Sequence, residues 1–572
     1  MSADHDSRRP RGHRRLLGSR ALKGVLTACV VGAVAVPGVA AADTSTTVVG
    51  ELLHVVTDGE SGAAAQAAEH TDADDGRLSW VQTGEGAVRI PAEQVADLPA
   101  GATVELTVGA TVEDGASDDG YDGAREVLDS DVLAPPPSTA PEPGPAPRGG
   151  LTNEVTVVLV APAGTSPDDT LLRDVVATVN GSVARFWSEQ TGGAITLGVT
   201  DSRDWLSTVA GCEDPAAMWN EAAAAVGFVP GPGRHLLLRL SGEAATRPAC
   251  SYALAEVGAA PASGGRLYVR DTSASVIAHE LGHNFGLGHS SSAQCDGAVE
   301  AVSCRISGYR DYYDVMGASW AQLGSLNAPQ ASALGVLTGD AERTVQVGEA
   351  ATSVTLAPVA GRTGVRALRL VDAEGTAYWL ELRAATGRDG WLATGDNVYR
   401  LDTGVLLHRA GRFPDTSLLL DGTPSPAAGW DADLQSAVPV GAPLVLSGGD
   451  FTVTVRSVDG GAAVVDVVPA PEPAAGQAVG GSASPAGNSV RERRGTLTGT
   501  PAPAPEAAAV APQAPPYWAP VDGLSVPRAG VALDPVADSS GFLGGLLLPV
   551  AESVLAGATL LLLQAVRRAR GR

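Results

Sequence analysis

The chain has 572 residues, of which 64 are acidic and 39 are Lys or Arg, giving a formal net charge of −25. This negative charge argues against nucleic acid or an anionic membrane surface as a partner and favours solubility outside the cell. Lys23 is the only lysine, and Ala, Gly and Pro are abundant, a composition typical of a high-GC bacterial genome. Two Pro-rich segments divide the chain, so several folded units are expected.

Residues 1–42 resemble a secretory signal peptide in their order of parts. A basic stretch ending at Lys23 precedes the apolar residues 24–37, and small residues at 39–41 offer a cleavage site. A lipobox-like sequence ends at Cys29, but it lies only a few residues after Lys23 and the apolar run continues beyond it. Cleavage near Ala41 or Ala42 is therefore favoured, and the protein is expected to be extracellular.

Residues 43–133 are predicted to form a small β domain, which could be a propeptide. Alternating apolar and polar residues at 87–90 and 103–108 are typical of strands. An acidic patch near Asp118 lacks calcium-loop spacing, and a solvated loop is the favoured interpretation. Residues 134–150 are rich in proline and are predicted to be an extended linker.

Residues 151–340 are predicted to be an α+β domain, because strand and helix patterns alternate along them. The helix pattern covers residues 167–190. The predicted strands are residues 155–160, 194–199, 235–240, 252–257 and 266–269.

A metal-binding motif follows the last of these strands. His279 and His283 are four residues apart, so both imidazoles lie on one face of a helix, where they can bind one Zn²⁺. Glu280 is rotated off that face and suits a general base, Gly286 ends the helix, and the turn brings His289 to the metal. Three neutral imidazoles leave a fourth tetrahedral position open, so a catalytic zinc is predicted.

The segment Tyr313-Asp314-Val315-Met316-Gly317 behind the third histidine adds a second signature. With it, the chain resembles the metzincin clan of zinc endopeptidases, most closely the gametolysin-like and reprolysin-like bacterial peptidases. The resemblance implies a twisted mixed sheet, an active-site helix and a Met-turn in which Met316 is a packing residue. It also implies that residues 252–257 are a sheet edge that binds an extended peptide.

The chain departs from some metzincins in two respects. Ala318 stands where they have a metal-site tyrosine two residues after the methionine, so Tyr312 and Tyr313 are weak substitutes. Residues 43–133 contain no cysteine, which excludes latency of the matrixin type, in which a cysteine thiolate blocks the zinc.

Four cysteines remain after signal removal, as expected in an oxidising compartment. Three pairings are open to them in principle. We predict the pairs Cys212–Cys250 and Cys295–Cys304, the second closing a loop between the third ligand and the Met-turn.

Residues 341–469 show short strand patterns separated by turn residues and are predicted to form a β-sandwich-like domain. The expected strands are residues 353–356, 367–370, 378–383, 404–408, 417–420 and 451–455. Asp421, Asp431 and Asp450 are interpreted as turn residues, and His408 as structural.

The end of the chain has two parts. Residues 470–540 are Pro/Ala/Gly-rich and are predicted to be a disordered stalk. Residues 541–572 hold an apolar stretch and a basic tail, which favours a membrane anchor. The alternative is a degenerate wall-sorting signal at residues 548–552.

The sequence therefore predicts a secreted, surface-anchored zinc endopeptidase acting on protein or peptide substrates, with Glu280 as the base and no covalent intermediate. One alternative is a hydrolase of cell-wall peptide. Another is a non-catalytic adhesion or glycan-binding protein, although the intact ligands and Glu280 argue against it. The oligomeric state is left open.

Overall fold

The computed structural model describes residues 45–58, 76–136, 150–301, 304–319 and 322–471. The predicted signal peptide, nearly all of the stalk, the anchor and most of the Pro-rich linker lie outside these residues. Among the described residues, no helix combines the length and apolar character needed to span a bilayer.

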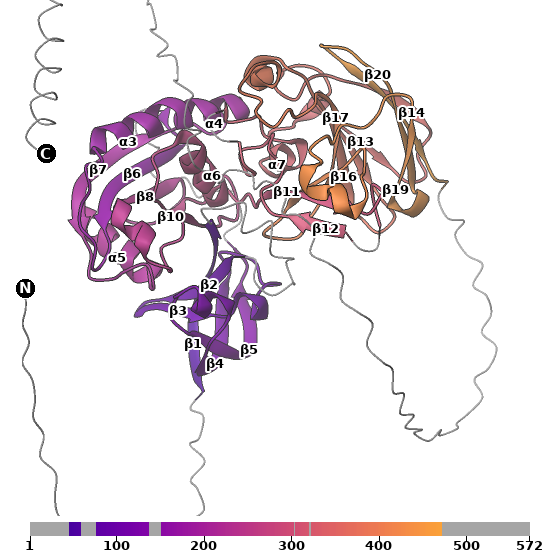
Figure 1. Ribbon diagram of the computed structural model, residues 1–572. Coiled ribbons are helices and arrows are strands. Elements are labelled where there is room, and N and C mark those ends of the chain that lie inside the picture. The colour runs from indigo at the N-terminus through magenta and orange to yellow at the C-terminus, as the bar shows by residue number, and fades with distance from the viewer. Residues whose placement is uncertain (1–44, 59–75, 137–149, 302–303, 320–321, 472–572) are drawn as a thin grey trace, which may run out of the picture. The chain divides into compact units, whose positions relative to one another are not determined.

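A ten-stranded mixed sheet runs through the first half of the chain (Figure 1). Its order is β3-β2-β1-β9-β10-β8-β6-β7, with β4 paired to β1 and β5 to β4. The strands are β1 (Thr46–Asp58), β2 (Arg77–Thr83), β3 (Gly86–Ile90), β4 (Thr103–Val112), β5 (Ala124–Ala134), β6 (Asn153–Ala161), β7 (Leu197–Ser207), β8 (Arg234–Leu240), β9 (Ala253–Glu256) and β10 (Gly265–Val269). Strands β7, β6, β8 and β10 are parallel, and β9 is antiparallel to β10.

Helices cover both faces of the parallel strands, as Figure 1 shows. On one face lie α6 (Ala274–Asn284) and a continuous helical run of α3 (Leu172–Thr178), the π-helical η3 (Val179–Val183) and α4 (Ala184–Gln190), while α5 (Pro215–Val226) covers the other. Strand β6 contributes side chains to the hydrophobic cores on both faces of the sheet. Val157 packs in the core on the α6 side, and Val158 packs in the core on the α5 side. This alternation is what a strand buried on both faces requires.

The second half of the chain builds two further sheets, one of seven strands and one of four. One shared core contains residues from both, which agrees with a sandwich-like packing. The strands are β11 (Ser290–Cys295), β12 (Cys304–Ser307), β13 (Glu342–Gln346), β14 (Thr352–Leu356), β15 (Ala367–Val371), β16 (Ala377–Arg383), β17 (Gly404–Ala410), β18 (Ser417–Leu420), β19 (Pro443–Leu446), β20 (Phe451–Val458) and β21 (Ala463–Pro469).

The remaining helices are short. They are α2 (Gly115–Asp118), α7 (Ala328–Ala333) and the 3₁₀ segments η1 (Ala92–Gln94), η4 (Gly242–Thr246), η6 (Gly339–Ala341), η7 (Gly387–Ala393), η8 (Ala427–Ala432) and η9 (Ser447–Gly449).

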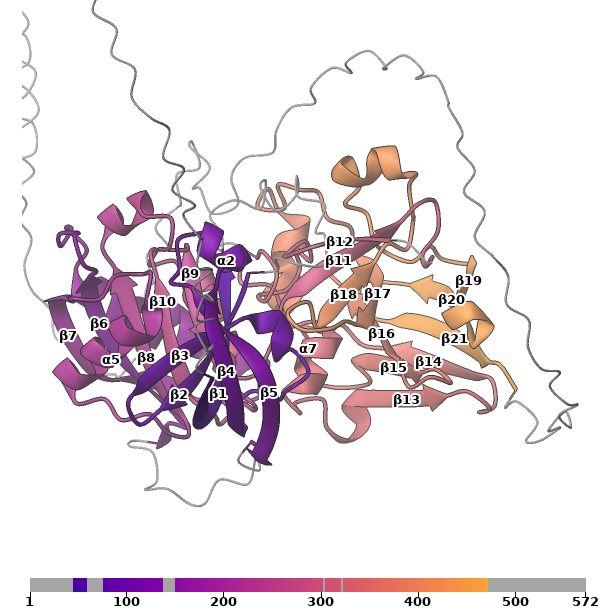
Figure 2. The same cartoon turned by 90° about the horizontal axis from the view of Figure 1, so that it is seen from below.

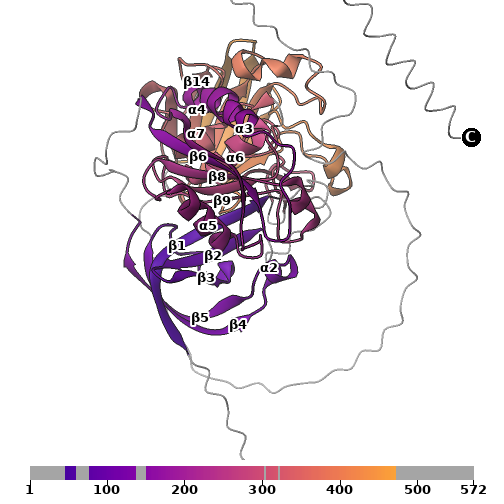
Figure 3. The ribbon, with the colours of Figure 1, turned by 90° about the vertical axis from the view of Figure 1, so that its left-hand side faces the viewer.

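Hydrogen-bonded sheets cross two of the predicted domain boundaries. Strand β11 precedes residue 340 but pairs with β18, so part of the predicted catalytic segment completes the C-terminal sheet (Figure 2). Strand β1 of the predicted N-terminal domain pairs with β9 (Figure 3). Strand pairing over long sequence separations, which the positions of the proline-rich segments do not reveal, decides which segments fold together.

Most predicted strands and the long helix are present, with shifted ends. The helix begins at Leu172 and not at residue 167, and β7 begins at Leu197 and extends to Ser207. Both predicted disulfides are confirmed, Cys212–Cys250 and Cys295–Cys304.

Candidate metal centre and active site

Helix α6 presents the first two histidines of the motif. His279 and His283 are fully buried, and the Nδ1 of each donates a hydrogen bond to a backbone carbonyl, Val315 O at 2.8 Å and Leu287 O at 2.8 Å. These bonds fix the ring orientations and leave each Nε2 lone pair for a metal. Burial lowers the pKa of both imidazoles, which favours the neutral form that binds metal.

The chain then turns sharply to bring up the third histidine. Helix α6 ends at Asn284, and Gly286 takes a left-handed φ of 92° at which a side chain would be strained. His289 follows, and its backbone N–H donates to Pro414 O at 2.6 Å. A C-terminal loop therefore helps to place this ligand.

The predicted Met-turn lies directly against the helix. Met316 is fully buried, and its sulfur stands only 2.2 Å from the position that a Cβ on Gly282 would take. Asp314 holds the turn by accepting hydrogen bonds from Met316 N at 2.6 Å and Ser290 Oγ at 3.0 Å. Glycine at position 282 is required for this close approach.

The three histidines converge in a way that fits a metal ion. Their Nε2 atoms are buried, and none has a hydrogen-bond partner within the part of the chain that the structure describes. The donor atoms all lie within 4.8 Å of one another, and the cluster includes a fourth residue, Asp58, from β1. Three neutral imidazoles and a carboxylate are a donor set that suits Zn²⁺.

Asp58 was not predicted from the sequence. Its Oδ2 lies 3.4 Å from His279 Nε2 and its Oδ1 lies 3.4 Å from His289 Nε2. Ligand atoms on a tetrahedral ion with bonds of 2.0 to 2.1 Å lie roughly 3.3 to 3.4 Å apart. A single Asp at the end of a strand carries no local signal; only the pairing of β1 with β9 brings it here.

Residues 249–326 match the model of a family described as metallo-peptidase family M12B, reprolysin-like. The match contains the helix, all three histidines and the Met-turn. This part of the chain is a reprolysin-like metzincin, a zinc metalloendopeptidase. Among curated proteins, none matches the chain.

The metzincin's Glu280 lies beside the cluster. Both of its carboxylate oxygens are buried and lack a hydrogen-bond partner among the described residues. Burial raises the pKa of this carboxyl well above its usual range, and the charge of Asp58 adds to the rise. A carboxyl group with a raised pKa is suited to accept and return a proton.

A tyrosine also reaches the metzincin centre, but not one of those considered from the sequence. The Tyr309 hydroxyl donates to Asp58 Oδ1 at 2.7 Å, and its ring centroid lies 4.1 Å from that of His289. Tyr313 instead donates to Asp402, and Tyr312 stacks on Tyr399. A search for a tyrosine two residues after Met316 could not find Tyr309, because Tyr309 precedes the Met-turn.

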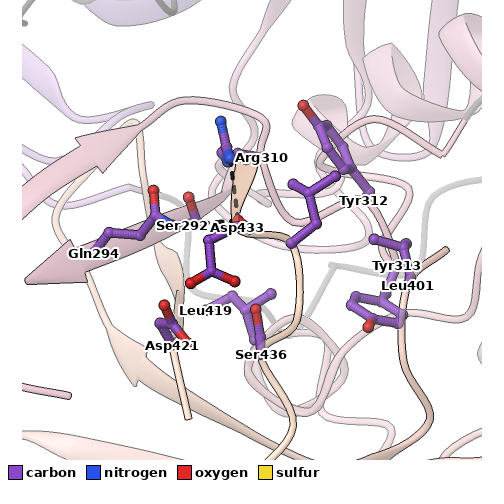
Figure 4. A pocket seen from close by; sticks show the side chains of 11 residues that line it. Ser292, Gln294, Arg310, Tyr312, Tyr313, Leu401, Leu419, Asp421, Asp433 and Ser436 are labelled. Carbon is purple, nitrogen blue, oxygen red and sulfur yellow. Dashed lines mark hydrogen bonds between the residues drawn. The ribbon is translucent and has the colours of Figure 1, made fainter. Parts of the chain in front are cut away.

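A small pocket is lined by residues of β11, β18 and the loop before the Met-turn, together with residues between 401 and 436 (Figure 4). Arg310 lies in its wall, and its guanidinium donates to Trp430 O at 2.7 Å and to two further backbone carbonyls. No metal-site histidine lines this pocket. The Arg310 guanidinium is already engaged by these backbone oxygens, so it is not available to bind an anionic ligand.

Proposed function

We propose that the protein is an exported, C-terminally anchored bacterial endopeptidase that hydrolyses peptide bonds in extended protein segments. The observation that carries this proposal is the convergence of the unpartnered Nε2 atoms of His279, His283 and His289 beside Glu280. The match of this segment to a reprolysin-like family gives the arrangement its chemistry.

The histidines would hold Zn²⁺, which supplies a Lewis acid for the scissile carbonyl and lowers the pKa of the attacking water. Glu280 takes a proton from that water as it attacks, and then delivers the proton to the leaving amine. The fixed Nδ1 hydrogen bonds of His279 and His283 keep the rings in place through the cycle.

Strand β9 would bind the substrate. It pairs with β10 on one side and with β1 on the other, so it becomes a sheet edge when β1 leaves it, and it lies against helix α6. An extended peptide can add to such an edge through backbone hydrogen bonds, independently of most side chains. A segment from the middle of an unfolded chain can bind in this way. This favours an endopeptidase, which cleaves internal peptide bonds.

Three features support export and attachment. The two disulfides require an oxidising compartment, residues 1–42 have the pattern of a signal peptide, and residues 541–572 combine an apolar stretch with a basic tail. A sortase-processed wall attachment is the alternative to a membrane anchor. Mass determination of the mature C-terminus separates them, because sortase cleavage removes the basic tail.

The function is tested with the purified full chain and, in parallel, the Asp58→Ala chain, since Asp58 lies in the metal cluster. We expect one zinc per chain, cleavage of unfolded casein in at least one of the two, and loss of cleavage on chelation or with Glu280→Ala. Zinc without cleavage of casein in either chain overturns the proposal. Release of amines from purified cell-wall peptide would then favour the hydrolase of cell-wall peptide. If no amines are released, the non-catalytic adhesion protein would be favoured.

A further inference from the structure

The last residues of β1 lie where an extended peptide would bind. Residues 55–58 run antiparallel to β9, with Val56 opposite Ala255 and Asp58 opposite Ala253. Tyr252 N donates to Asp58 O at 2.8 Å, and Val257 N donates to His54 O at 2.9 Å. Figure 3 shows the two strands side by side. The predicted substrate edge is therefore already paired on both sides, by β1 and by β10.

Asp58, the last residue of β1, places its carboxylate in the metal cluster. Asp58 is 2% exposed, and its Oδ2 lacks a hydrogen-bond partner among the described residues. Each oxygen lies 3.4 Å from the Nε2 of one histidine, the spacing of neighbouring ligands on one tetrahedral zinc. A buried carboxylate is costly unless a cation compensates it, and zinc is the cation that this donor set would hold.

We infer that β1 keeps the intact chain latent: residues 55–58 occupy the substrate's place on β9, and Asp58 fills the fourth position at the metal. This rests on the proposed peptidase function. The strand excludes a peptide backbone and the carboxylate excludes the attacking water. Activation then requires β1 to leave β9, as release of the N-terminal strands would achieve.

Cobalt substitution tests this ligand without relying on activity. We compare full-length wild type, Asp58→Ala and the control Asp129→Ala, which removes an exposed carboxylate on β5. Asp58→Ala should change the visible Co²⁺ spectrum and admit acetohydroxamate to the metal, while wild type and Asp129→Ala should do neither. Identical spectra and equal hydroxamate affinity in all three chains would overturn the inference.

Activity supplies the second measurement. Casein cleavage by Asp58→Ala should exceed that of wild type on the order of 100-fold, because an intramolecular competitor acts at millimolar effective concentration. Asp58→Asn keeps the side-chain volume, so it tests the same point if the alanine variant does not fold. Equal, measurable cleavage by wild type and both variants refutes latency. Absence of cleavage in every chain, with the cobalt change present, refutes the peptidase function instead.

A separate observation concerns Tyr309. Its φ is 59°, a left-handed conformation that is unfavourable for a residue other than glycine. The strained backbone aims the hydroxyl at Asp58 Oδ1, 2.7 Å away, with the ring against His289. The two Asp58 carboxylate oxygens occupy the positions that the substrate carbonyl oxygen and the attacking water would take. The geometry points to Tyr309 as a catalytic residue that donates a hydrogen bond to the oxyanion once Asp58 has left.

Tyr309→Phe is compared with Tyr312→Phe, both in the Asp58→Ala chain. We expect Tyr309→Phe to lower kcat about 10²–10³-fold with little change in KM or zinc content. Tyr312→Phe should leave all three unchanged. If Tyr309 only holds Asp58, Tyr309→Phe will raise cleavage by the otherwise wild-type chain and have no effect once Asp58 is gone, which would overturn the assignment.

Discussion

Glu280 and the three histidines are all buried, yet the polar atoms that face one another among them lack partners within the described residues. Leaving one such atom unsatisfied costs about 1–3 kcal/mol, so a cluster of them is retained only where a ligand compensates it. In the proposed function the histidine atoms would bind the ion, and the Glu280 carboxylate would be left for proton transfer.

Replacement of Glu280 separates these two roles. Glu280→Gln keeps the size of the side chain but removes its basicity, so kcat should fall by at least 10²–10⁴-fold while zinc content stays at one per chain. The measurement is casein cleavage and metal analysis in the Asp58→Ala background. Retention of more than a tenth of the activity would mean that another group is the base.

His235 makes folding stability depend on pH. It is fully buried between Asn284 and Asn153, and burial lowers its pKa from 6.5 to about 4. Between pH 4 and 6.5, His235 is therefore protonated in the unfolded chain but neutral in the folded chain. Stability from this residue is complete above pH 6.5 and is lost as pH falls to 4, by about 3 kcal/mol.

The test is urea unfolding of wild type and His235→Gln between pH 4 and 7. The wild-type free energy of unfolding should fall more steeply with acid than that of the variant. Parallel curves would show that His235 is not the responsible group.

At the scale of elements, the end of α6 decides where the third ligand lies. A Cβ on Gly286 would approach Gly258 O to 2.9 Å, and the φ of 92° is unfavourable for alanine. Gly286→Ala should therefore displace His289 and weaken zinc binding by at least about ten-fold, as a strain of 1–2 kcal/mol implies.

Gly297→Ala is the matched control, because Gly297 has a φ of 63° but no atom within 4 Å of its Cβ position. It carries the backbone strain without the clash. Zinc affinity, measured by competition with a chromophoric chelator, should be unchanged in this variant. Equal losses in both variants would mean that backbone strain alone, and not the position of His289, controls the metal.

Elements with a strong local pattern were predicted well. Valines 175, 179 and 183 mark one face of the long helix, and the run from Val155 to Val160 marks β6. The prediction that residues 252–257 form a sheet edge was wrong, because β9 lies between β10 and β1 and pairs with both. In the whole chain, β1 covers it, and nothing in either segment's sequence specifies the other.

At the scale of the whole molecule, the C-terminal half packs against the segments that surround the metal cluster. β11 pairs with β18 directly after His289, Asp311 pairs with the buried His408 at 3.1 Å, and Ala328 N donates to Glu381 at 2.5 Å. Removing the C-terminal half would leave buried charges and the edge of β11 without their partners.

Truncation tests this dependence. A chain ending at residue 340 should lose zinc stoichiometry and cooperative thermal unfolding, whereas a chain ending at residue 471 should keep both, since it retains every described contact. Metal analysis after gel filtration and scanning calorimetry measure the two properties. A 340-residue chain that holds one zinc would show that the first half folds by itself.

The sequence alone predicted His279, His283 and His289 as metal ligands, Glu280 as the base and a turn at Gly286. Their spacing follows from helix geometry, which acts over a few residues and is therefore visible in a single chain. It also gave both disulfides and most strands. The tertiary structure alone decided that Asp58 and Tyr309 reach the metal centre, that β1 covers the substrate edge, and that β11 belongs to the C-terminal sheet. These contacts join residues up to 251 positions apart, where no periodicity links the partners and only complementary packing of whole strands selects them.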